Sequence, residues 1–409
     1  MQVESLHSLG PQWLKSIVMF AIVVECRVAT TTRSVKRHGS IGRAPDLVPH
    51  QQIGPTHVRW RGRTLCYFGG CDYFRLSRHP AVLRATQRGL SEFGLNVAAS
   101  RLTTGHHAAY TQLEREMVRF FDAESALLLP SGYLSDLAVA QALAGEFSIA
   151  LIDERAHACL RDAAQMLGCR VRQFRHRDVA DLARVLARCS SKTRPLVLTD
   201  GMFSADGTVA PLRDYLAVLP RRGMILVDDA HGAGVLGRRG RGTLEFAGVG
   251  RSRVVQTITL SKAFGVYGGA VLCSRELRRR ILASSRVMIG ATPLPPPLAN
   301  AALASVKTLA TNPHLREQLR KNAGRVRSAL AAAGFVLPDS PGPIISICPR
   351  HSRDVARLRR ALLAANILPP FMHYPGGPRA GHFRFAISSA HTAAQLNALT
   401  RVLIETCGP

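Results

Sequence analysis

Short apolar runs alternate with helical stretches along the middle of the chain, from Pro80 to about Ala304. The run "ESALLLPSGY" leads into "LSDLAVAQALA", and "FSIALIDERAH" leads into "ACLRDAAQMLG", so each pair predicts a strand followed by a helix. Further strands are predicted at "RPLVLTDGMFS", "GMILVDDAHG", "VVQTITLSKAFG" and "GGAVLCS", and a helix at "RELRRRILASS". Strands that alternate with helices indicate an α/β fold, with a mostly parallel central sheet sandwiched by helices.

The two ends of the chain show different patterns. The segment 57–68, "HVRWRGRTLCYF", alternates polar and apolar positions as a strand or hairpin does. After the proline run "PLPPP", the apolar runs "PIISICP" and "HFRFAISS" lie among helical stretches and predict a smaller α+β domain. The predicted organisation is a basic, disordered N-terminal extension (1–50), a segment that leads into the fold (51–79), a large α/β domain (80–304) and a small C-terminal α+β domain (305–409).

The N-terminal extension contains an apolar run, Ile17–Val24, and a stretch from Arg27 to Arg43 that is basic and free of acids. The apolar run is shorter than the roughly 20 residues that cross a bilayer, so no membrane span is predicted. The basic stretch fits a disordered arm or part of a transit peptide, but we favour an extension from a start codon placed upstream of the true one.

Composition limits the classes of function. The 409 residues are 46% hydrophobic and carry a formal net charge of +27, which would suit a nucleic-acid binder. The arginines are spread along the whole chain without a nucleic-acid-binding motif, so we expect no specific nucleic acid and instead small anionic substrates. The nine cysteines form no CxxC pair and no zinc-like spacing with histidine, which predicts reduced thiols in a cytoplasmic protein and no bound metal.

Unusual polar residues follow four of the predicted strands. In a mostly parallel sheet the carboxyl ends of the strands lie at one edge, where such folds bind their ligands. We therefore expect one site at this edge. Its residues come from all four strand ends: Gly132 and Tyr133, Ser204, Asp228 with Asp229 and His231, and Lys262.

Lys262 is one of only six lysines among the 54 Lys and Arg residues. A lysine can lose its proton and act as a nucleophilic amine, which an arginine does not do. Most lysines in such loops are surface residues, but Lys262 follows the hydroxyls of Thr259 and Ser261 and precedes the glycine-rich "GVYGG". This setting favours an amine held near a phosphate and an aldehyde, with which it would form a Schiff base.

Asp228 and His231 form a D-x-x-H motif at the end of the predicted strand "MILVD". A lone aspartate at this position would more often cap the next turn. Together with the histidine and the glycines that follow, Asp228 fits a partner for a pyridinium nitrogen, which it would keep protonated so that the ring withdraws electrons. His231 would then hydrogen-bond the phenolic oxygen of the same ring.

Two weaker signals complete the predicted site. Ser131, Gly132 and Tyr133 open a helix directly after a strand, and the amides of a helix N-terminus suit a phosphate. Many helices start in this way, so the motif is weak by itself. His157, in "DERAHAC", would be a structural histidine in most proteins, but beside the residues above we predict that it stacks on an aromatic ring.

A series of motifs runs from about Asp72 to Thr400: "LSRHPAV", "ASRLTTG", "LEREMVRFFDAESALLLPSGY", "DERAHAC", "FRHRD", "DGMFSADGTVAPL", "VDDAHGAGVLGRRGRG", "TLSKAFGVYGG", "ATPLPPP" and "FRFAISSAHT". In their order and spacing these motifs resemble the α-oxoamine synthases. That family belongs to the fold type I enzymes that use pyridoxal 5′-phosphate (PLP), with a class I/II aminotransferase fold. A resemblance of this extent implies the fold more firmly than the substrates.

The resemblance implies roles for the catalytic positions. Lys262 would bind PLP covalently and later shuttle the α-proton of the substrate. Asp228 would pair with the pyridine nitrogen, and His157 would stack on the ring. His231 and Ser204 would lie near the phenolic oxygen.

Further positions match the binding residues of the family. Gly132, Tyr133 and Thr259 would hold the phosphate region of PLP. Thr292, in "ATPLPPP", would reach the phosphate from the partner subunit, which implies a homodimer with the active site at its interface. Arg384 matches the arginine that binds the carboxylate of the amino acid, a group that a guanidinium can hold with two hydrogen bonds.

The implied reaction is a decarboxylative condensation of an amino acid with an acyl-CoA or acyl-carrier thioester to an α-amino ketone, which makes the chain a PLP-dependent C-acyltransferase. Some family members omit the net loss of carbon dioxide. Two alternatives remain open from the residues alone. A PLP-dependent aminotransferase or aldolase would use the same lysine and aspartate on a small amino acid, and a non-catalytic protein with this fold would use its basic surface for binding.

Several positions depart from the family pattern: the entry motif, Tyr110 in place of a usual histidine, "HAC" in place of "HAS", and Pro375 where a threonine is common. The entry motif bears most on the substrate. Where the family has Asn-x-Tyr-Leu-Gly, this chain reads "CDYFR", with Cys71 in place of the asparagine and Arg75 in place of the glycine. The motif lies near the substrate in the family, so the specificity for the acyl group stays open. A long-chain or aromatic acyl group, or a carrier-protein thioester, fits the sequence as well as a pimeloyl group.

Overall fold

A seven-stranded sheet lies at the centre of the described chain, which comprises residues 48–349, 351–373, 378 and 380–408 of a computed structural model. The strand order is β4-β10-β9-β8-β7-β5-β6, and β10 alone runs antiparallel to its two neighbours. The strands are β4 (Ser125–Leu129), β5 (Ile149–Asp153), β6 (Arg170–Phe174), β7 (Pro195–Asp200), β8 (Met224–Asp228), β9 (Val254–Thr259) and β10 (Gly269–Cys273). This mostly parallel sheet confirms the predicted fold class.

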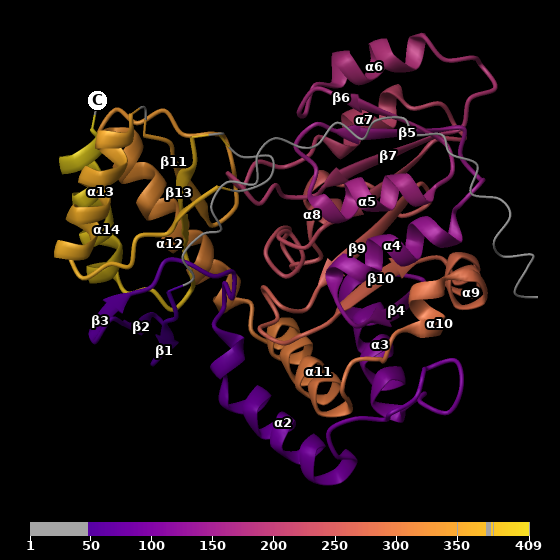
Figure 1. Cartoon of the computed structure of the whole chain (residues 1–409), viewed down its shortest axis with the longest axis horizontal. Coiled ribbons are helices and arrows are strands. Elements are labelled where there is room, and N and C mark those ends of the chain that lie inside the picture. Colours follow the sequence, from indigo (N-terminus) through magenta and orange to yellow (C-terminus); the bar gives the residue numbers. More distant parts are fainter. Residues whose placement is uncertain (1–47, 350, 374–377, 379, 409) are drawn as a thin grey trace, which may run out of the picture. The chain divides into compact units, whose positions relative to one another are not determined.

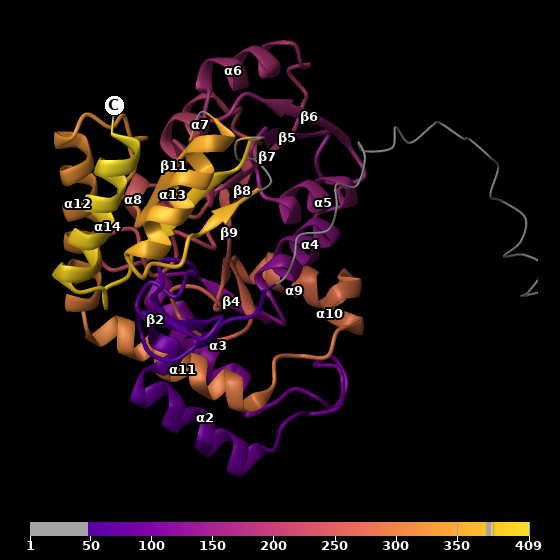
Figure 2. The same ribbon diagram turned by 60° about the vertical axis from the view of Figure 1, so that its left-hand side comes forward.

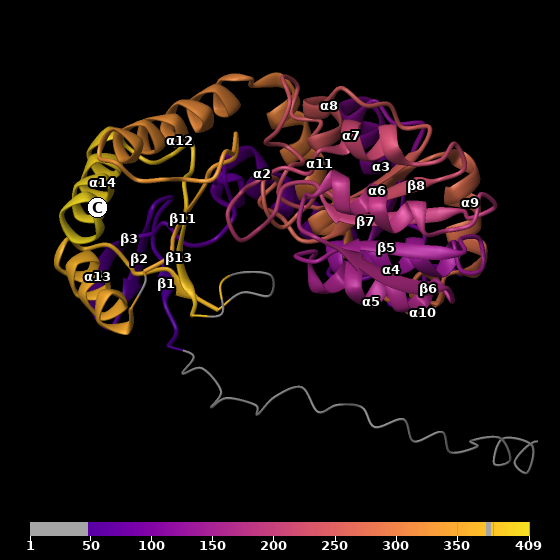
Figure 3. The same cartoon turned by 90° about the horizontal axis from the view of Figure 1, so that it is seen from above.

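Helices cover both faces of this sheet (Figure 3). Along β4, Leu127 and Leu129 pack on one face, whereas Ala126 and Leu128 pack on the other, as the two-residue period of a strand requires. The first face is covered by α4 (Gly132–Ala142), α5 (Ala158–Met166), α9 (Arg275–Ser284) and α10 (Arg286–Gly290). The second face is covered by α3 (Ala108–Phe121), α6 (Val179–Ala187), α7 (Leu212–Val218), α8 (Thr243–Ala247) and α11 (Pro296–Thr311).

Helix α2 (Pro80–Phe93) packs along α11, outside the second layer (Figure 2). The two helices approach closely at Gly89, where a Cβ would lie 2.8 Å from the Cα of Pro297. Only glycine therefore allows this contact without a shift of the backbone. The pair links the N-terminal part of the fold to the helix that leads into the C-terminal domain.

The C-terminal domain is a three-stranded antiparallel sheet, in the order β11-β13-β12, that packs against three helices. Its elements are α12 (His314–Ala332), β11 (Ile344–Ile347), α13 (Ser352–Ala364), β12 (Phe371–Met372), β13 (His382–Ala386) and α14 (Ala393–Cys407). Phe383 and Phe385 of β13 are fully buried in its core. The apolar run "HFRFAISS" is thus a strand, as predicted.

The predicted hairpin at 57–68 is also present. It consists of β2 (His57–Trp60) and β3 (Arg63–Cys66), with β1 (Gln51–Gln52) added at its edge, and η1 (Leu76–Arg78) follows. The segment joins the C-terminal domain (Figure 1), because the amide of Leu368 donates to the carbonyl of Cys66 at 2.9 Å and that of Ala386 donates to the carbonyl of Phe68 at 2.7 Å. Residues far apart in sequence thus form one core.

Residues 1–47 lie outside the described part of the chain, and so does nearly all of the predicted N-terminal extension. From His50 onward the described chain forms one compact unit. The boundaries at 79/80 and 304/305 stay a prediction. Among the residues described, no helix has both the length and the apolar character that a membrane crossing requires.

Candidate active site

Asp228 and Lys262 lie at the same edge of the central sheet. Asp228 is the last residue of β8, and Lys262 follows its parallel neighbour β9 after two residues. The carboxylate of Asp228 is buried and held at both oxygens: Oδ1 accepts the amide of Ala230 at 3.0 Å, and Oδ2 accepts the thiol of Cys159 at 3.2 Å. A carboxylate and an amine thus follow adjacent parallel strands at one edge of the sheet.

The loop that carries Lys262 is shaped by close backbone packing. Gly265 has φ of 64°, and its amide donates to the carbonyl of Lys262 at 2.9 Å. A Cβ on Gly265 would lie 2.3 Å from the amide nitrogen of Ser77, so the turn requires glycine. Before the lysine, the hydroxyls of Thr259 and Ser261 lie 2.8 Å apart.

His157 is the N-cap of α5, at the carboxyl end of β5. Its Nδ1 accepts the amide of Cys159 at 3.3 Å and lies 2.8 Å from the sulfur of the same residue. Burial lowers the pKa of His157, and the positive charge of Lys262 lowers it further, although Asp228 opposes this effect. The imidazole is therefore neutral at physiological pH, which suits stacking on an electron-poor ring.

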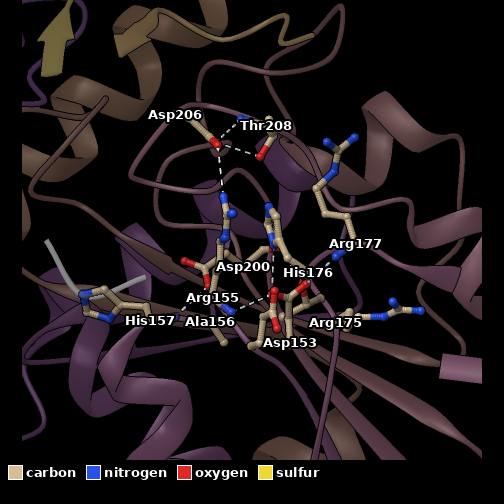
Figure 4. A network of polar contacts seen from close by, with 12 residues as sticks. Asp153, Arg155, Ala156, His157, Arg175, His176, Arg177, Asp200, Asp206 and Thr208 are labelled. Carbon is tan, nitrogen blue, oxygen red and sulfur yellow. Dashed lines mark hydrogen bonds and ion pairs between the residues drawn. The ribbon is translucent and has the colours of Figure 1, made fainter. Parts of the chain in front are cut away.

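A polar network behind His157 fixes its backbone (Figure 4). The amide of His157 donates to Oδ2 of Asp200, the last residue of β7, at 2.8 Å. Asp153, which ends β5, accepts the amide of Arg155 at 2.8 Å and lies 3.0 Å from Nδ1 of His176. Two strand-end carboxylates thus hold the turn that presents His157.

His231 lies in the turn after β8 and contacts a residue that the sequence patterns did not assign to the site. Its Nδ1 is 2.8 Å from the hydroxyl of Tyr73, and both side chains are buried. Burial lowers the pKa of His231 well below its usual value, and the charges of Lys262 and Arg384 lower it further. Tyr73 belongs to the "CDYFR" motif, which stands out in the sequence for its departures and not for this tyrosine.

The predicted phosphate residues form a tight cradle at the N-terminus of α4. Ser131 caps the helix, since its hydroxyl accepts the amide of Leu134 at 3.3 Å. A Cβ on Gly132 would lie 2.8 Å from Cβ of Thr259, so strand end and helix start are in direct contact. The first amides of a helix have no acceptor within the helix and attract anions. The hydroxyl of Tyr133 donates to Asp162.

Arg384 is buried on β13 and reaches across to the central sheet. Its Nε donates to the backbone carbonyl of Ser204, which lies in the turn after β7. Its two outer nitrogens, Nη1 and Nη2, lie 3.6 and 3.5 Å from Sγ of Cys71. The guanidinium therefore stands where the two domains meet, at the edge that also carries Lys262.

Thr292 is not part of this cluster. It lies exposed in the stretch between α10 and α11, and no contact found among the described residues joins it to the other predicted site residues. The other predicted residues lie at the carboxyl edge of the sheet or, for Arg384, contact it.

Three buried carboxyl groups lie close together at this edge, and the sequence patterns point only to Asp228. The Oδ1 atom of Asp136, on α4, accepts the hydroxyl of Thr257 at 2.6 Å. Burial raises the pKa values of Asp136 and Asp200 well above their usual values, and the charge of Asp228 adds to this rise. Asp200 ends a strand, which is the one sequence signal that would have found it.

The arrangement fits PLP at each of its functional groups. The buried carboxylate of Asp228 suits a protonated ring nitrogen, and the half-buried amine of Lys262 suits the aldehyde carbon. The cradle between Gly132 and Thr259, which a Cβ would fill, suits the phosphate. His157 and His231, both neutral, suit the ring face and the ring oxygen.

Comparisons with known proteins agree with this geometry. Residues 69–403 match the family model described as aminotransferase class I and II. The chain is 39% identical over 357 residues to the 8-amino-7-oxononanoate synthase of Methylococcus capsulatus, covering 86% of this chain and 91% of that protein. It is 37% identical over 345 residues to the same enzyme of Thioalkalivibrio sulfidiphilus, covering 84% of this chain and 88% of that protein.

Solved structures give the same result. The serine palmitoyltransferase of S. paucimobilis, with PLP and myriocin bound, is 27% identical with a TM-score of 0.82, covering 87% of this chain and 90% of that one. The chain therefore belongs to the class I and II aminotransferase family and, within it, to the α-oxoamine synthases. It is a PLP-dependent C-acyltransferase that condenses an amino acid with an acyl thioester.

Proposed function

We propose that the residues at the carboxyl edge of the sheet are the active site of this acyltransferase. The observation that carries the proposal is the pairing of the buried Asp228 carboxylate with the Lys262 amine on adjacent strand ends, between two neutral histidines. PLP, when bound, supplies an electron-withdrawing ring that stabilises negative charge on the α-carbon of the amino acid.

Each residue has one task in this proposal. Asp228 keeps the proton on the ring nitrogen, and its own orientation is fixed by Ala230 and Cys159. The Nζ atom of Lys262 would hold PLP covalently, and it would remove and return the α-proton of the bound amino acid. His157 packs on the ring face, and His231 holds the ring oxygen.

The binding residues orient the two ends of the substrate complex. Gly132, Tyr133 and Thr259 hold the phosphate, and Arg384 holds the carboxylate of the amino acid. The new carbon–carbon bond joins the α-carbon to the acyl carbon, the thiol of the thioester leaves, and the carboxylate is lost as carbon dioxide. One amino acid and one acyl thioester thus give one α-amino ketone, one carbon dioxide and one free thiol.

The names of the relatives contain a product, and the carbon atoms of that product indicate a pair of substrates. In 8-amino-7-oxononanoate the amine and the ketone sit on neighbouring carbons, and a single methyl carbon follows the amine-bearing one. A decarboxylative condensation gives that product from alanine and the thioester of a seven-carbon dicarboxylic acid. We propose L-alanine and a pimeloyl thioester as the leading pair, because the sequence identity to these relatives, 37 and 39%, is higher than to the structural neighbours.

A second pair is serine with a long-chain acyl thioester. It is supported by the serine palmitoyltransferase structures, which match with a TM-score of 0.82, whereas an 8-amino-7-oxononanoate synthase of Francisella tularensis, 24% identical, matches with 0.73. Coenzyme A and an acyl carrier protein both carry acyl groups as thioesters, so both carriers belong in the test.

The test starts with the visible absorption of the purified protein after addition of PLP. We expect a cofactor band that changes on addition of one amino acid from a panel of glycine, L-alanine and L-serine. Lys262→Ala is expected to lack the original band and to lose at least about 10³-fold in kcat. Lys307→Ala, on the exposed side of α11, is the matched lysine control and should behave like the wild type.

Product analysis then separates the reactions. Pimeloyl and palmitoyl thioesters of coenzyme A and of a carrier protein are offered with the selected amino acid, and free thiol and carbon dioxide are measured together. Equal amounts of both support the condensation. Conversion of the amino acid with a keto acid or an aldehyde, without a thioester, would instead establish an aminotransferase or aldolase.

We further propose a cytoplasmic homodimer in which Thr292 completes the partner's phosphate site. The eight described cysteines are free thiols, as in a reducing compartment. Exposed apolar side chains lie on α10, which precedes Thr292, and in the loop after α2: Ile289 on the helix, and Leu95 and Leu102 in the loop. The hydroxyl of Ser100 in that loop donates to the carbonyl of Ile289 at 2.8 Å, so loop and helix present one surface.

Subunit complementation tests this arrangement. Lys262→Ala and Thr292→Glu each damage a site, but in a mixed dimer one of the two sites receives both changes and the other receives neither. We expect activity to appear when the two inactive variants are mixed and re-equilibrated. A monomer in sedimentation analysis, or mixtures that stay inactive although the subunits exchange, would contradict the shared site.

A further inference from the structure

Cys71 occupies the end of the Arg384 guanidinium that a carboxylate would use. Its sulfur lies 3.5 and 3.6 Å from the two outer nitrogens, while Nε of Arg384 donates to the carbonyl of Ser204. A carboxylate binds arginine through the same pair of outer nitrogens when it accepts two parallel hydrogen bonds. One sulfur atom thus holds the position of a substrate carboxylate.

The surroundings of this sulfur are cationic. Arg384 faces it from β13, Lys262 from the loop after β9 and the Tyr73 hydroxyl from its own segment, with Arg75 and Tyr67 farther away. Although burial opposes ionisation, the charges of Arg384 and Lys262 and the hydrogen bonds from Arg384 and Tyr73 lower the pKa of Cys71.

Other cysteines of the chain behave in the opposite way. Burial raises the pKa of Cys66 and of Cys273 to about 12, since the arginines that act on them lower it less than burial raises it. Cys71 differs from these two cysteines in its direct contact with both outer nitrogens of a guanidinium. In the PLP-loaded enzyme, where Lys262 is joined to the cofactor, Arg384 is the cation that acts on this sulfur.

We propose that Cys71 is a specificity-determining residue: before the amino acid binds, its sulfur pairs as a thiolate with the two outer nitrogens of Arg384, and it takes up a proton when the carboxylate of the amino acid replaces it. This inference rests on the proposed function of Arg384. A proton from solvent forms the S–H bond as the carboxylate arrives, so atoms and charges balance in this step.

Two anions on one guanidinium would repel each other in this partly desolvated position, so thiolate and carboxylate exclude one another. Carboxylate binding is then linked to proton uptake. Above the pKa of the thiol, each further pH unit should weaken carboxylate binding by about tenfold.

The first experiment measures the thiol directly in the PLP-loaded enzyme. Iodoacetamide alkylates each cysteine at a rate that follows its thiolate, as the sulfur displaces iodide, and peptide mass spectrometry resolves the sites. Propionate is the probe, because it carries a carboxylate but no amine that could react with the cofactor. Cys348, which is exposed, is the internal control.

We expect Cys71 to be alkylated with a midpoint pH below the roughly 8.5 of an ordinary thiol. Propionate should slow alkylation at Cys71 and not at Cys348, at least about tenfold at saturation, while chloride at equal ionic strength should not. A midpoint at or above that ordinary value, or an alkylation rate at Cys71 that propionate leaves unchanged, would overturn the proposal. If the reagent does not reach Cys71, the second experiment decides.

The second experiment follows KM for the amino acid against pH in the wild type and in Cys71→Ser, which removes the ionisable thiol but keeps a small polar group. The ratio of the wild-type to the variant KM should rise by about tenfold per pH unit above the thiol pKa. The ratio cancels the titration of the amino acid itself. A ratio that stays constant with pH would refute the role of Cys71.

Arg384→Gln separates this inference from the proposed function. If it raises KM for the amino acid strongly while the Cys71→Ser ratio is flat, the carboxylate site stands and only the thiolate is excluded. If Arg384→Gln leaves KM unchanged, the proposed carboxylate site itself is wrong. Cys348→Ser is the matched cysteine control and should leave the pH profile of KM unchanged.

Discussion

Two adjacent aspartates at the end of β8 have different surroundings. Asp228 turns to the site and accepts the amide of Ala230 and the thiol of Cys159. Asp229 turns inward, where it accepts the amide and hydroxyl of Thr243 at 2.8 and 2.6 Å and the amide of Gln256 at 2.6 Å. Asp228 is thus positioned for the reaction, whereas Asp229 stabilises the fold.

Asparagine at the two positions should therefore give different defects. Asp228→Asn removes the charge that holds the ring proton, and we expect kcat to fall about 10²–10³-fold with little loss of stability. Asp229→Asn places an amide among donors and should lower the free energy of unfolding by about 1–3 kcal/mol. Steady-state kinetics and urea unfolding of both variants, with PLP bound, measure the contrast. A large loss of kcat in both variants would contradict the assignment of a catalytic role to Asp228 and a structural role to Asp229.

Residue types and strand ends were sufficient to predict Lys262, Asp228, His231 and His157 as one group. The sequence could not predict Tyr73, because it comes from a segment about 150 residues before its partner His231 and becomes a neighbour only when the chain folds. Asp136 was hidden for a different reason: it lies within a helix whose other buried residues are mostly apolar.

At the scale of elements, the start of α4 and the end of β9 touch through Gly132. A Cβ there would lie 2.8 Å from Cβ of Thr259, so Gly132→Ala should push the helix away from the strand. Such overpacking costs about 1–3 kcal/mol. We expect PLP affinity to fall about tenfold to a hundredfold, as measured by fluorescence titration. Gly324→Ala, on α12 where an added Cβ would have no atom within 4 Å, is the control and should not reduce the affinity.

His391 joins the N-terminal segment to the start of α14. Its Nε2 lies 3.2 Å from the carbonyl of Tyr67, its Nδ1 accepts the amide of Ser388 at 2.9 Å, and its ring stacks on Phe68 with centroids 4.2 Å apart. Burial lowers the pKa of His391 from 6.5 to about 3, and the charge of Arg75 adds to this effect. The folded state therefore holds this histidine in its neutral form.

Acid should loosen this junction. A histidine with a lowered pKa in the folded state gives stability that is present above pH 6.5 and lost as the pH falls toward about 3. The loss amounts to about 1.4 kcal/mol per pH unit over that window. Urea unfolding at several pH values in this range gives the free energy of unfolding as a function of pH. This free energy should fall less steeply with decreasing pH in His391→Asn than in the wild type. Equal slopes would mean that His391 is protonated in the folded protein as well.

One strand of the central sheet, β6, is not predicted by the sequence patterns. In β6 the residues are "RVRQF", and only Phe174 of these is buried, because β6 is the edge strand beside β5. An edge strand lacks the continuous apolar run by which the inner strands were recognised. The alternating pattern predicts the hairpin of β2 and β3. It does not predict that the hairpin pairs with the C-terminal domain, because Cys66 bridges to Ile367, which is far away in the sequence.

At the scale of the whole molecule, the two domains contribute unlike groups to one site. The central sheet supplies the residues proposed to bind PLP, and the C-terminal sheet supplies Arg384, whose Nε bonds to the carbonyl of Ser204. Sequence patterns predict each sheet separately, because their signals are local. The contact between them depends on a buried arginine that looks like any other of the many arginines in the chain.

The net charge of +27 is a property of the whole molecule, and it affects the binding of the acyl thioester. Coenzyme A carries phosphates, and a cationic molecule attracts it from a distance that salt shortens from about 30 Å at 0.01 M to about 3 Å at 1 M. We expect KM for an acyl-CoA to rise with ionic strength over this range, at constant kcat. The same acyl group on N-acetylcysteamine, a carrier without phosphates, should show a much smaller rise, which separates attraction of the carrier from effects on the site. If both thioesters respond equally, the positive charge serves something other than the acyl donor.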